Sequence, residues 1–462
     1  MDNQGTKAKR RTALLSTTAL LAAVAAGFVI GVNPLLGSIM LCAVVIGIAV
    51  FTRPAVGIAL CILSLILGQL VRIPAFGTEG AILPNDIILP GLFAGWLLKG
   101  LLERRVGFPS SPLSWPIGTM LGVFVLTFIA GIAQLPFVTT HEQFVAALYI
   151  IRWLEYALLF FVVADTVRTQ KIGARLLWTL FVSAVALAVL GFVQLKLFPD
   201  FGFMVPKGWD PHIGRLLSTW FDPNFLGGFF SFIAVTSAGI AFFVAGRQRT
   251  ALWTVAALMF IGLVLTFSRS GYAAFIVGVT VLTFIKSRRF FLLLVVVAAL
   301  VVMGVPRVQE RVLGAFRIDE TAKTRIVSWQ NALSVVRDFP VTGIGYNTYR
   351  YVQVDYGFQK NASEHSAGGS DSSLLTILVT TGPAGLAVYL WLLWAYVSIA
   401  WQSYHKGTTP LIRGLGLGAL SAIASVTAHS LFINSLLFPH MMETIAVVFG
   451  VLVGLRYVES VP

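Results

Sequence analysis

Apolar stretches close to the length of a membrane span recur from one end of this chain to the other, and a helix needs about 20 residues to cross a bilayer. Hydrophobic residues make up 57% of the 462 residues and charged residues only 11%. The pattern predicts an all-α, polytopic integral membrane protein of about 12 to 14 transmembrane helices, forming a single transmembrane domain over residues 1–462.

The expected spans follow from these stretches. They lie near residues 13–31, 35–51, 54–71, 86–102, 115–134, 148–166, 175–196, 223–245, 251–267, 270–286, 290–305, 372–400, 411–433 and 438–456. The second and third are short enough to be re-entrant or fused.

The basic residues predict how the chain lies in the membrane. Lys and Arg in short loops are held on the cytoplasmic side. Here they gather in the N-terminal tail and in alternate loops, while the short connections near 31–34, 135–147 and 434–440 contain none. Both termini are therefore expected to be cytoplasmic and the long polar loop, residues 306–370, extracytoplasmic. We expect the chemistry at that loop.

Charge and cysteine content exclude two classes of function. The formal net charge of +14 would suggest a nucleic-acid partner for a soluble protein, but here topology and contact with anionic membrane lipid explain most of it. Cys42 and Cys61 both fall inside predicted spans, and the chain has no CxxC motif or Cys/His cluster. No nucleic acid, metal or cofactor is predicted.

The long loop contains a predicted amphipathic helix at 321–339. Its apolar residues recur every three or four positions, as one helical face requires; they are Ile326, Trp329, Leu333 and Val336. Such a helix would lie on the outer membrane surface with this face inward. It either only caps the bundle or also carries Arg325 and Arg337 to a site.

Two further polar elements lie on the same predicted side. The tight turn 267–271 holds Arg269, the only basic residue in that turn, on the side where short loops otherwise lack positive charge. This departure favours function over simple contact with lipid head groups. In the segment 214–224, Asp222 or Asn224 could instead only cap the helix that follows.

Four segments, taken in order, carry a resemblance. They are RLLSTWFDPNFLGG from Arg215, TFSRSG from Thr266, TRIVSWQNALSVVRDFPVTGIGYNTY from Thr324 and DSSLLTILVTTGPAGL from Asp371. Each is weak alone, but their order and the placement of the long loop make the set specific. Over residues 210–390 the chain resembles the O-antigen ligase and Wzy-type polysaccharide polymerase family of bacterial membrane glycosyltransferases.

The resemblance implies transfer of a glycan from an undecaprenyl-diphosphate-linked donor to an acceptor hydroxyl, without a metal, at the outer face of the bacterial inner membrane. The acceptor would be another glycan in a polymerase or lipid A-core in a ligase, and other polysaccharide assembly proteins are possible partners. Arg269 and Arg325 match the family's two important arginines, and Arg215 matches a further basic position that would hold donor phosphate. A diphosphate leaving group suits the planar, permanently charged arginine fork. The remaining expected substrate contacts are Asn224, Arg337 and Tyr346.

The chain departs from the family where many members, ligases especially, carry a His-Asn pair whose His is the proposed base. Here Asp371 and Ser372 stand instead. Asp can accept a proton, although its ordinary pKa of about 3.9 makes it a weak base. Polymerase-like members more often carry Asp, which favours chain extension. Asp371 could instead only cap the next helix, and His365 could act as the base or simply be solvated.

Other ionisable residues and other classes of function stay open at this point. His429, His440 and Glu443 would surround the last extracytoplasmic turn and could line an acceptor entrance, while Arg152 and Glu155 could pair on one helical face. A transporter or lipid flippase would place its polar residues near the midplane, whereas here they gather at the outer surface. A non-catalytic assembly partner is the third alternative.

Overall fold

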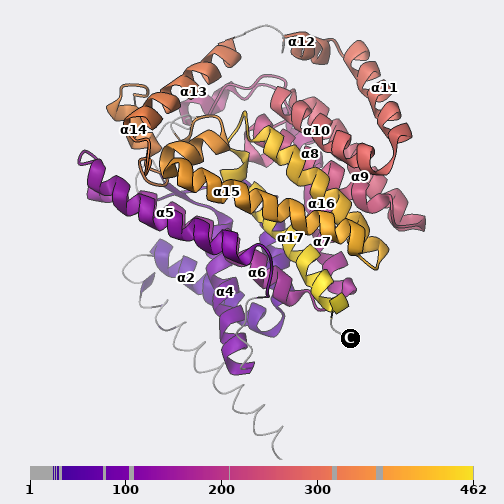
Figure 1. Cartoon of the computed structure of the whole chain (residues 1–462), viewed down its shortest axis with the longest axis horizontal. Helices are drawn as coiled ribbons and strands as arrows, with labels where there is room; N and C mark the ends of the chain where they lie inside the picture. The colour runs from indigo at the N-terminus through magenta and orange to yellow at the C-terminus, as the bar shows by residue number, and fades with distance from the viewer. Residues whose placement is uncertain are drawn as a thin grey trace, which may run out of the picture.

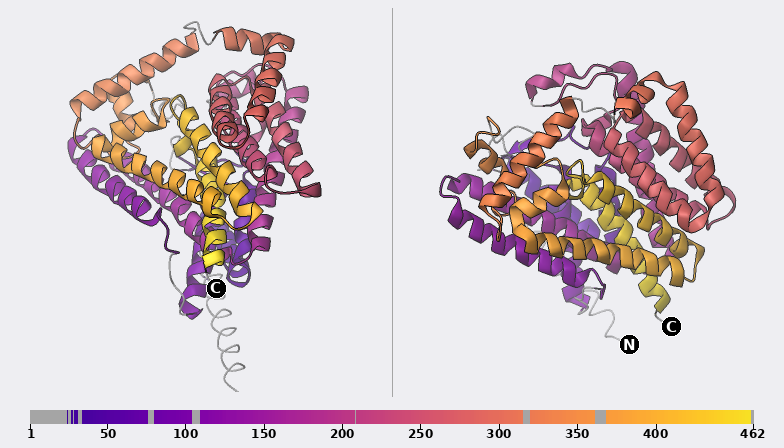
Figure 2. Two further views of the ribbon diagram at one scale, coloured as in Figure 1. Left: turned by 45° about the vertical axis from the view of Figure 1, so that its right-hand side comes forward. Right: turned by 45° about the horizontal axis from the view of Figure 1, so that its top comes forward.

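Most of the chain is described by a computed structural model. The described residues are 24, 27, 29–30, 34–75, 80–103, 109–207, 209–314, 320–360 and 368–460. The helices pack into one bundle, with an arch of shorter helices over one end (Figures 1 and 2). The C-terminus lies at the opposite end of the bundle.

Within these residues, ten helices are long and apolar enough to cross a membrane. They are α4 (Pro84–Glu103), α5 (Ser114–Gln134), α6 (Thr140–Thr166), α7 (Gln170–Leu197), α8 (Pro223–Ala241), α9 (Gly246–Thr266), α10 (Arg269–Lys286), α15 (Ser373–Lys406), α16 (Pro410–His429) and α17 (Pro439–Ser460). The chain is an all-α polytopic membrane protein, as its apolar stretches predict.

Three further apolar helices are shorter or less completely described: α2 (Pro34–Thr52), α3 (Pro54–Ser64) and α11 (Arg288–Gly304). The 11 residues of α3 rise only about 16 Å, roughly half of a bilayer core. The predicted span at 54–71 is therefore wrong as a full crossing, because turns replace the helix after Ser64. The predicted span at 13–31 lies almost wholly outside the described residues.

A small β-hairpin follows α3, which the all-α prediction did not include. Strands β1 (Ile73–Ala75) and β2 (Gly80–Ile82) pair antiparallel, and Ile73 lies opposite Ile82. The hairpin leads directly into α4.

The helix α6 begins eight residues before the predicted span at 148–166. Thr139 caps it, accepting from the Glu142 backbone N–H, while the Glu142 carboxylate accepts from the Thr139 N–H (2.7 Å). This reciprocal pair satisfies two of the N–H groups that a helix start leaves unpaired. A capping box outside the apolar stretch thus extends the helix beyond what hydropathy alone marks.

The long loop forms the arch over the bundle. It contains α12 (Pro306–Gly314), α13 (Glu320–Asp338) and α14 (Tyr349–Asp355), and Figure 1 shows α12 and α13 above the ends of the long helices. The predicted amphipathic helix at 321–339 corresponds to α13. Its side chains Ala332 and Val335 are fully buried.

The face of α13 that packs on protein overlaps the predicted apolar face only in part. Ile326 and Leu333 are exposed (38% and 45%), whereas Trp329 and Val336 are half-buried. The placement of this face against the membrane stays a prediction. The helix packs on α15 mainly through Ala332 and Val335, because small and branched side chains permit close approach. The sequence holds two overlapping apolar stripes, and spacing alone does not decide which one meets protein.

A break in α15 receives the end of the loop. Gly382 (φ 67°) interrupts the helix, and the proline after it has no N–H to bond the Val379 carbonyl. The loop supplies the missing donor, since the Ile344 N–H bonds to Val379 (3.1 Å) and the Gly345 N–H bonds to Thr380 (2.9 Å). A backbone carbonyl freed inside an apolar bundle must find such a partner.

Glycines permit this close approach. A Cβ at Gly343 would lie 2.5 Å from the Val379 carbonyl oxygen, and one at Gly131 of α5 would lie 2.2 Å from the Ile344 oxygen. Both distances are shorter than side chains tolerate. The GIG sequence of the loop is thus fixed between α5 and the broken α15.

Candidate active site

The turn between α9 and α10 presents Arg269 at the start of a helix. Phe267 closes α9 in a left-handed conformation (φ 50°), and Ser268 caps α10 by accepting from the Gly271 N–H (3.2 Å). Arg269 is the first residue of α10 and is half-buried. Helix N-termini carry partial positive charge, so helix and side chain together favour an anion here.

Arg215 holds this turn in place. Its guanidinium donates from Nε to the Thr266 carbonyl (2.8 Å) and from Nη2 to the Phe267 carbonyl (3.4 Å) and to Asn224 Oδ1 (3.2 Å). Carbonyl groups at a helix end lack intrahelical donors, which the arginine supplies. The contacts give Arg215 a positioning role; contact with donor phosphate stays a prediction.

Arg307 of α12 contacts the same turn from the arch. It donates to the carbonyls of Gly214 (2.8 Å) and Ile213 (2.5 Å), and its guanidinium lies 4.6 Å from the centre of the Phe267 ring. Sequence reasoning missed this residue, because no local pattern distinguishes it from other basic residues near the membrane. It ties the long loop to the turn that bears Arg269.

The start of α8 also contacts the turn between α9 and α10. Asp222 caps α8, accepting from the N–H groups of Asn224 (2.6 Å) and Phe225 (3.1 Å), so the capping alternative is confirmed for Asp222. Asn224 Oδ1 accepts from the Ser268 hydroxyl (3.0 Å) as well as from Arg215. Asn224 therefore joins the start of α8 to the start of α10.

Strained backbone conformations occur within the four segments that carry the family resemblance. In the described part of the chain, all non-glycine residues with positive φ fall within them: Ser218, Phe221, Phe267, Asn347 and Asp371. Side chains pay a steric cost in this region, and such strain concentrates at functional sites.

Asp371 precedes α15 in a left-handed conformation (φ 54°). Ser372, not Asp371, caps this helix, accepting from the Leu375 N–H (3.4 Å), so the capping alternative for Asp371 is wrong. Asp371 is exposed, and the Ser328 hydroxyl of α13 donates a hydrogen bond to its carboxylate.

The surroundings of Asp371 raise the pKa of its carboxyl group. Surrounding protein removes water from the carboxylate and raises its pKa, which the positive charge of Arg325 and the bond from Ser328 partly offset. The negative charges of Asp210 and Asp222 raise the pKa further. Desolvation and like charges both disfavour the ionised form.

The charges of Arg325 and Asp222 both act on His429. Arg325 is half-buried on α13, whereas His429, at the end of α16, is fully buried and its Nδ1 bonds to the Ser435 hydroxyl. Gly228 of α8 admits this ring, since a Cβ there would lie 2.7 Å from it. The predicted site residues Arg325 and Asp371 are thus brought together, and His429, left unassigned by the sequence, joins them.

The other predicted site residues differ in position. Arg337 is exposed in the last turn of α13. Tyr346 is buried, with its ring stacked 3.9 Å from that of Phe124 on α5; it anchors the loop, and contact with substrate stays a prediction. His365 lies outside the described residues.

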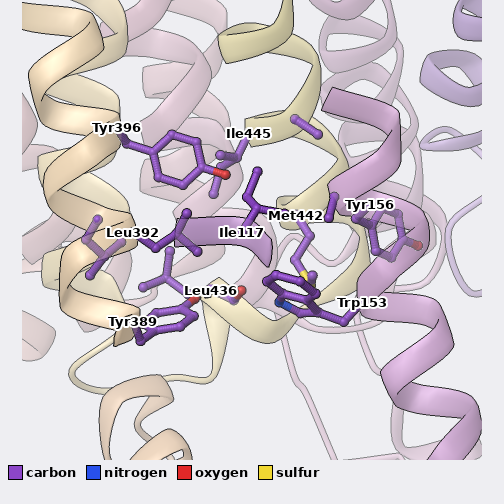
Figure 3. Close-up of a pocket in the computed structure, with 12 residues that line it drawn as sticks. Ile117, Trp153, Tyr156, Tyr389, Leu392, Tyr396, Leu436, Met442 and Ile445 are labelled. Carbon is purple, nitrogen blue, oxygen red and sulfur yellow. Dashed lines mark hydrogen bonds between the residues drawn. The ribbon is translucent and has the colours of Figure 1, made fainter. Parts of the chain in front are cut away.

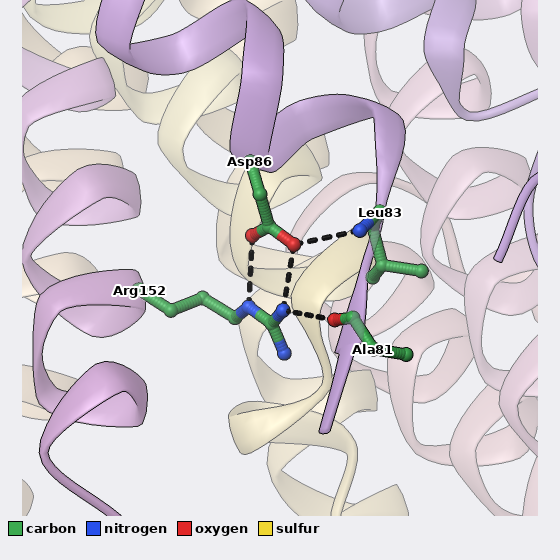
Figure 4. Close-up of polar contacts among 4 residues, drawn as sticks. All are labelled: Ala81, Leu83, Asp86 and Arg152. Carbon is green, nitrogen blue, oxygen red and sulfur yellow. Dashed lines mark hydrogen bonds and ion pairs between the residues drawn. The ribbon is translucent and has the colours of Figure 1, made fainter. Parts of the chain in front are cut away.

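Arg152 pairs with Asp86 of α4, not with Glu155 as the helical spacing suggested. Figure 4 shows the two-pronged contact, from Nε to Oδ1 (2.9 Å) and from Nη2 to Oδ2 (2.6 Å), with a further bond from Nη2 to the Ala81 carbonyl (2.8 Å). Sequence reasoning missed Asp86 because 66 residues separate the partners.

His440 and Glu443 lie in a separate buried cluster within the bundle. The Glu443 carboxylate accepts from the Asn85 side chain of α4 (2.5 Å), and Asn85 accepts in turn from the Ser64 hydroxyl of α3. The His440 ring packs 4.8 Å from that of Trp220. Both ionisable side chains are fully buried, so their predicted place at an acceptor entrance is not supported.

An apolar cavity of about 50 Å³ lies between α5, α6, α15 and α17 (Figure 3). Its aromatic lining includes Trp153, Tyr156, Tyr389 and Tyr396. The lining contains no arginine, so this cavity does not suit a diphosphate.

The fold and the site define a class: a polytopic membrane protein whose polar residues converge where broken helices meet a long loop at one end of the bundle. The Wzy_C family model, described as O-antigen ligase, matches residues 254–390. This match includes Arg269, Arg325 and Asp371 and supports membership of the O-antigen ligase and Wzy family. No curated protein matches the chain. The family supports enzymatic activity of ligase or polymerase type in polysaccharide assembly.

Proposed function

We propose that this protein is a Wzy-like polysaccharide polymerase that extends a glycan from an undecaprenyl-diphosphate-linked donor at the outer face of the bacterial inner membrane. One observation carries the proposal most directly. Asp371, with a raised pKa and a left-handed backbone, lies within reach of the charge of Arg325. A proton acceptor beside a fixed cation is what glycosyl transfer from a diphosphate requires.

Arg269 and Arg325 bind the donor diphosphate in this mechanism. Their charges stabilise the negative charge that develops on the leaving group. The acceptor hydroxyl oxygen attacks the anomeric carbon as the bond from that carbon to the diphosphate oxygen breaks, and one such displacement inverts the configuration. The turn held by Arg215, Arg307 and Asn224 keeps Arg269 in position.

Asp371 accepts the proton of the attacking hydroxyl. An ordinary aspartate, with a pKa of about 3.9, is a weak base. Loss of water around the carboxylate and the neighbouring carboxylates raise the pKa of Asp371, which increases its basicity toward the hydroxyl. Arg325 opposes this rise, so the same arginine that binds the diphosphate also keeps Asp371 ionised.

The orientation is part of the proposal. We place both termini in the cytoplasm and the arch of α12 to α14 outside. The arch and the C-terminus lie at opposite ends of the bundle (Figure 1), which supports this assignment. The pattern of basic loops supports it as well.

An O-antigen ligase that transfers the glycan to lipid A-core is the second candidate. The description of the family model favours it. The two candidates differ in the acceptor, since a polymerase uses a second molecule of its own lipid-linked glycan and a ligase needs a different molecule.

The first test gives purified, detergent-solubilised protein an undecaprenyl diphosphate oligosaccharide from the host's pathway and follows product length without added acceptor. A ladder of products supports the polymerase, whereas unchanged donor that reacts only after lipid A-core is added supports the ligase. No reaction with either acceptor contradicts both.

The second test assigns the donor site. Arg269→Ala should abolish turnover while leaving folding intact, as monitored by the monodisperse elution of the protein. Arg249→Ala, which removes an exposed arginine from the first turn of α9, is the control and should retain activity. Normal turnover by well-folded Arg269→Ala protein would overturn the role of this arginine.

A further inference from the structure

The chain that follows Asp371 is bonded to the last connection, residues 430–438, which joins α16 to α17. The Ser373 N–H donates to the Ser430 carbonyl (2.8 Å). In return, the Leu436 N–H donates to the Ser373 hydroxyl (3.1 Å). Ser373 and Ser430 are both fully buried. The start of α15 is thus held against this connection.

Thr376 of α15 joins the chain before Asp371 to the same connection. Its hydroxyl accepts from the Ser370 N–H (3.1 Å) and lies 2.9 Å from Ser370 Oγ. The Thr376 hydroxyl donates in turn to Asn434 Oδ1 (3.0 Å). Ser370 and Thr376 are both buried, and a buried donor left without a partner costs free energy. Thr376 therefore links Ser370 to Asn434.

Asn434 lies where a glycine leaves room for it. A Cβ at Gly369 would lie 2.1 Å from Asn434 Nδ2, which is closer than a side chain tolerates. The connection that carries Asn434 is itself fixed, because His429 Nδ1 bonds to the Ser435 hydroxyl and both residues are fully buried. Asn434 is thus held between the end of α16 and the two residues that precede Asp371.

Asp371 itself has a strained backbone between two buried neighbours. Its φ of 54° lies in the left-handed region, which carries a steric cost for any residue with a side chain. Ser370 and Ser372 are buried, and the Ser370 hydroxyl donates to the Ser372 carbonyl across Asp371 (3.2 Å). Such strain persists only where the surrounding structure over-determines it. The hydrogen bonds of Thr376 provide that constraint.

Resting on the proposed function, we infer that Thr376 and Asn434 are positioning residues for the proposed base. They hold the backbone at Asp371 in the left-handed conformation that keeps its carboxylate near Arg325 and bonded to Ser328. Neither side chain needs to touch substrate. The connection between α16 and α17 thereby decides where the proton of the acceptor hydroxyl is received.

The test compares the turnover of the lipid-linked oligosaccharide by variants of the purified full-length protein. Thr376→Val removes the hydroxyl and keeps the shape of the side chain. Its kcat should fall about 10- to 100-fold, as expected for a misplaced catalytic group. The KM for the donor should stay within about threefold of the wild type, because Arg269 and Arg325, which bind the donor, are unchanged. Thr376→Ser keeps the hydroxyl and should restore most of the kcat.

Thr380→Val is the matched control. Thr380 lies one turn further along α15 and is equally buried, but its hydroxyl donates to the Thr376 carbonyl of its own helix (2.7 Å). The kcat and KM of Thr380→Val should match those of the wild type. An equal loss of kcat in Thr376→Val and Thr380→Val would show that any hydroxyl removed from this helix has the same effect, which overturns the positioning role.

A second variant tests whether both residues act through one path. Asn434→Ala removes the acceptor of the Thr376 hydroxyl and should also lower kcat with little change in KM. The double variant should lose no more than Thr376→Val alone, because residues in one hydrogen-bond network do not act additively. Fully additive losses would assign the two residues to independent roles and contradict the link between them.

The pH profile distinguishes positioning from a general loss of structure. In the wild type, loss of water and the charges of Asp210 and Asp222 raise the pKa of Asp371 against the opposing effects of Arg325 and Ser328. A carboxylate released from this place returns toward the ordinary value of about 3.9. The fall of activity at low pH should therefore move to lower pH in Thr376→Val. An unchanged profile, with no rescue by Thr376→Ser, would show a merely structural role.

Asp371→Asn separates the positioning role from the proposed function. A loss of turnover in Asp371→Asn with wild-type kcat in Thr376→Val overturns the positioning role and leaves the base assignment intact. Wild-type turnover in Asp371→Asn removes the base itself, and a loss in Thr376→Val then has another cause. Loss in both, with the split between kcat and KM in Thr376→Val, supports both assignments.

Discussion

Two carboxyl groups of this protein lie in opposite surroundings, although both belong to polar clusters of one helical bundle. Asp371 is exposed, stands before α15 in a left-handed conformation, and lies near Arg325. Glu443 is fully buried within the regular helix α17 and accepts a hydrogen bond from Asn85. Solvent access and backbone strain together distinguish Asp371, the carboxyl group that can meet a substrate, from the buried Glu443.

The same contrast extends to the segments around each carboxyl group. Asp371 lies in a region where helices end, turn and restart. The side chains around it therefore come from loops that the rest of the fold holds in place. Glu443 joins α17 to α4 and, through Asn85, to α3. A polar contact between packed spans supports the bundle, whereas polar groups on interrupted segments can turn toward a bound molecule.

Among the changes that test this contrast between Asp371 and Glu443, the largest effect is expected from removing the exposed carboxylate. Asp371→Asn should lower turnover by about 10²- to 10⁴-fold, the usual contribution of a general base, because the amide cannot accept the proton. Polymer formation by purified protein measures it. Asp355→Asn, which changes an exposed carboxylate in the same loop, is the control. Turnover within threefold of the wild type in Asp371→Asn would remove Asp371 from the mechanism.

The pH dependence of turnover tests the role of Asp371 without changing that residue. Asp371 is active when ionised, so activity should fall as the pH drops through its pKa. Because that pKa is raised, the fall should occur above the value of about 3.9 typical of Asp. Arg325→Gln removes the charge that lowers the pKa, so the residual activity should fall at higher pH still. A shift toward lower pH in Arg325→Gln contradicts the electrostatic coupling.

A smaller effect is expected from changing Gly382, at the break in α15 where the end of the long loop docks. In Gly382→Ala the new Cβ would lie 2.1 Å from the Val341 carbonyl oxygen, at a φ of 67° that alanine disfavours. The loop should shift, lowering turnover by about 10- to 100-fold through misplacement of the site. Gly246→Ala has a similar φ of 61° but open space around it, so it separates strain from displacement. Equal losses in both variants would contradict a role for the docking contact.

The sequence predicts the long helices well and their interruptions poorly. Continuous apolar stretches mark α5, α7 or α9 to within a few residues, because a bilayer imposes a length on each span. The end of α3 and the docking of the loop on α15 depend on contacts between distant residues, such as Ile344 with Val379. No local pattern encodes those contacts.

The candidate site divides in a similar way. The short segments around Arg269, Arg325 and Asp371 were found from the sequence because, taken in order, they resemble the motifs of the O-antigen ligase and Wzy family. The partners that hold them were not, since Arg307 and Ser328 lie on amphipathic loop helices where such residues are common. Arg215 was predicted as a phosphate ligand, yet it donates to the carbonyls of the turn, which only the folded chain brings within reach.

The smallest effect is expected at the buried carboxyl group. Glu443→Gln keeps an oxygen that can accept from Asn85, so turnover should stay within about threefold of the wild type and the free energy of unfolding should change by less than about 1.5 kcal/mol. Glu443→Leu leaves the Asn85 donor without its acceptor and should cost about 1–3 kcal/mol, measured as a lower Tm in detergent. A large loss of turnover in Glu443→Gln at unchanged Tm would assign this cluster to the chemistry and erase the distinction between the two carboxyl groups. Preserved turnover in Gln and loss of stability only in Leu would instead establish Glu443 as a link between spans.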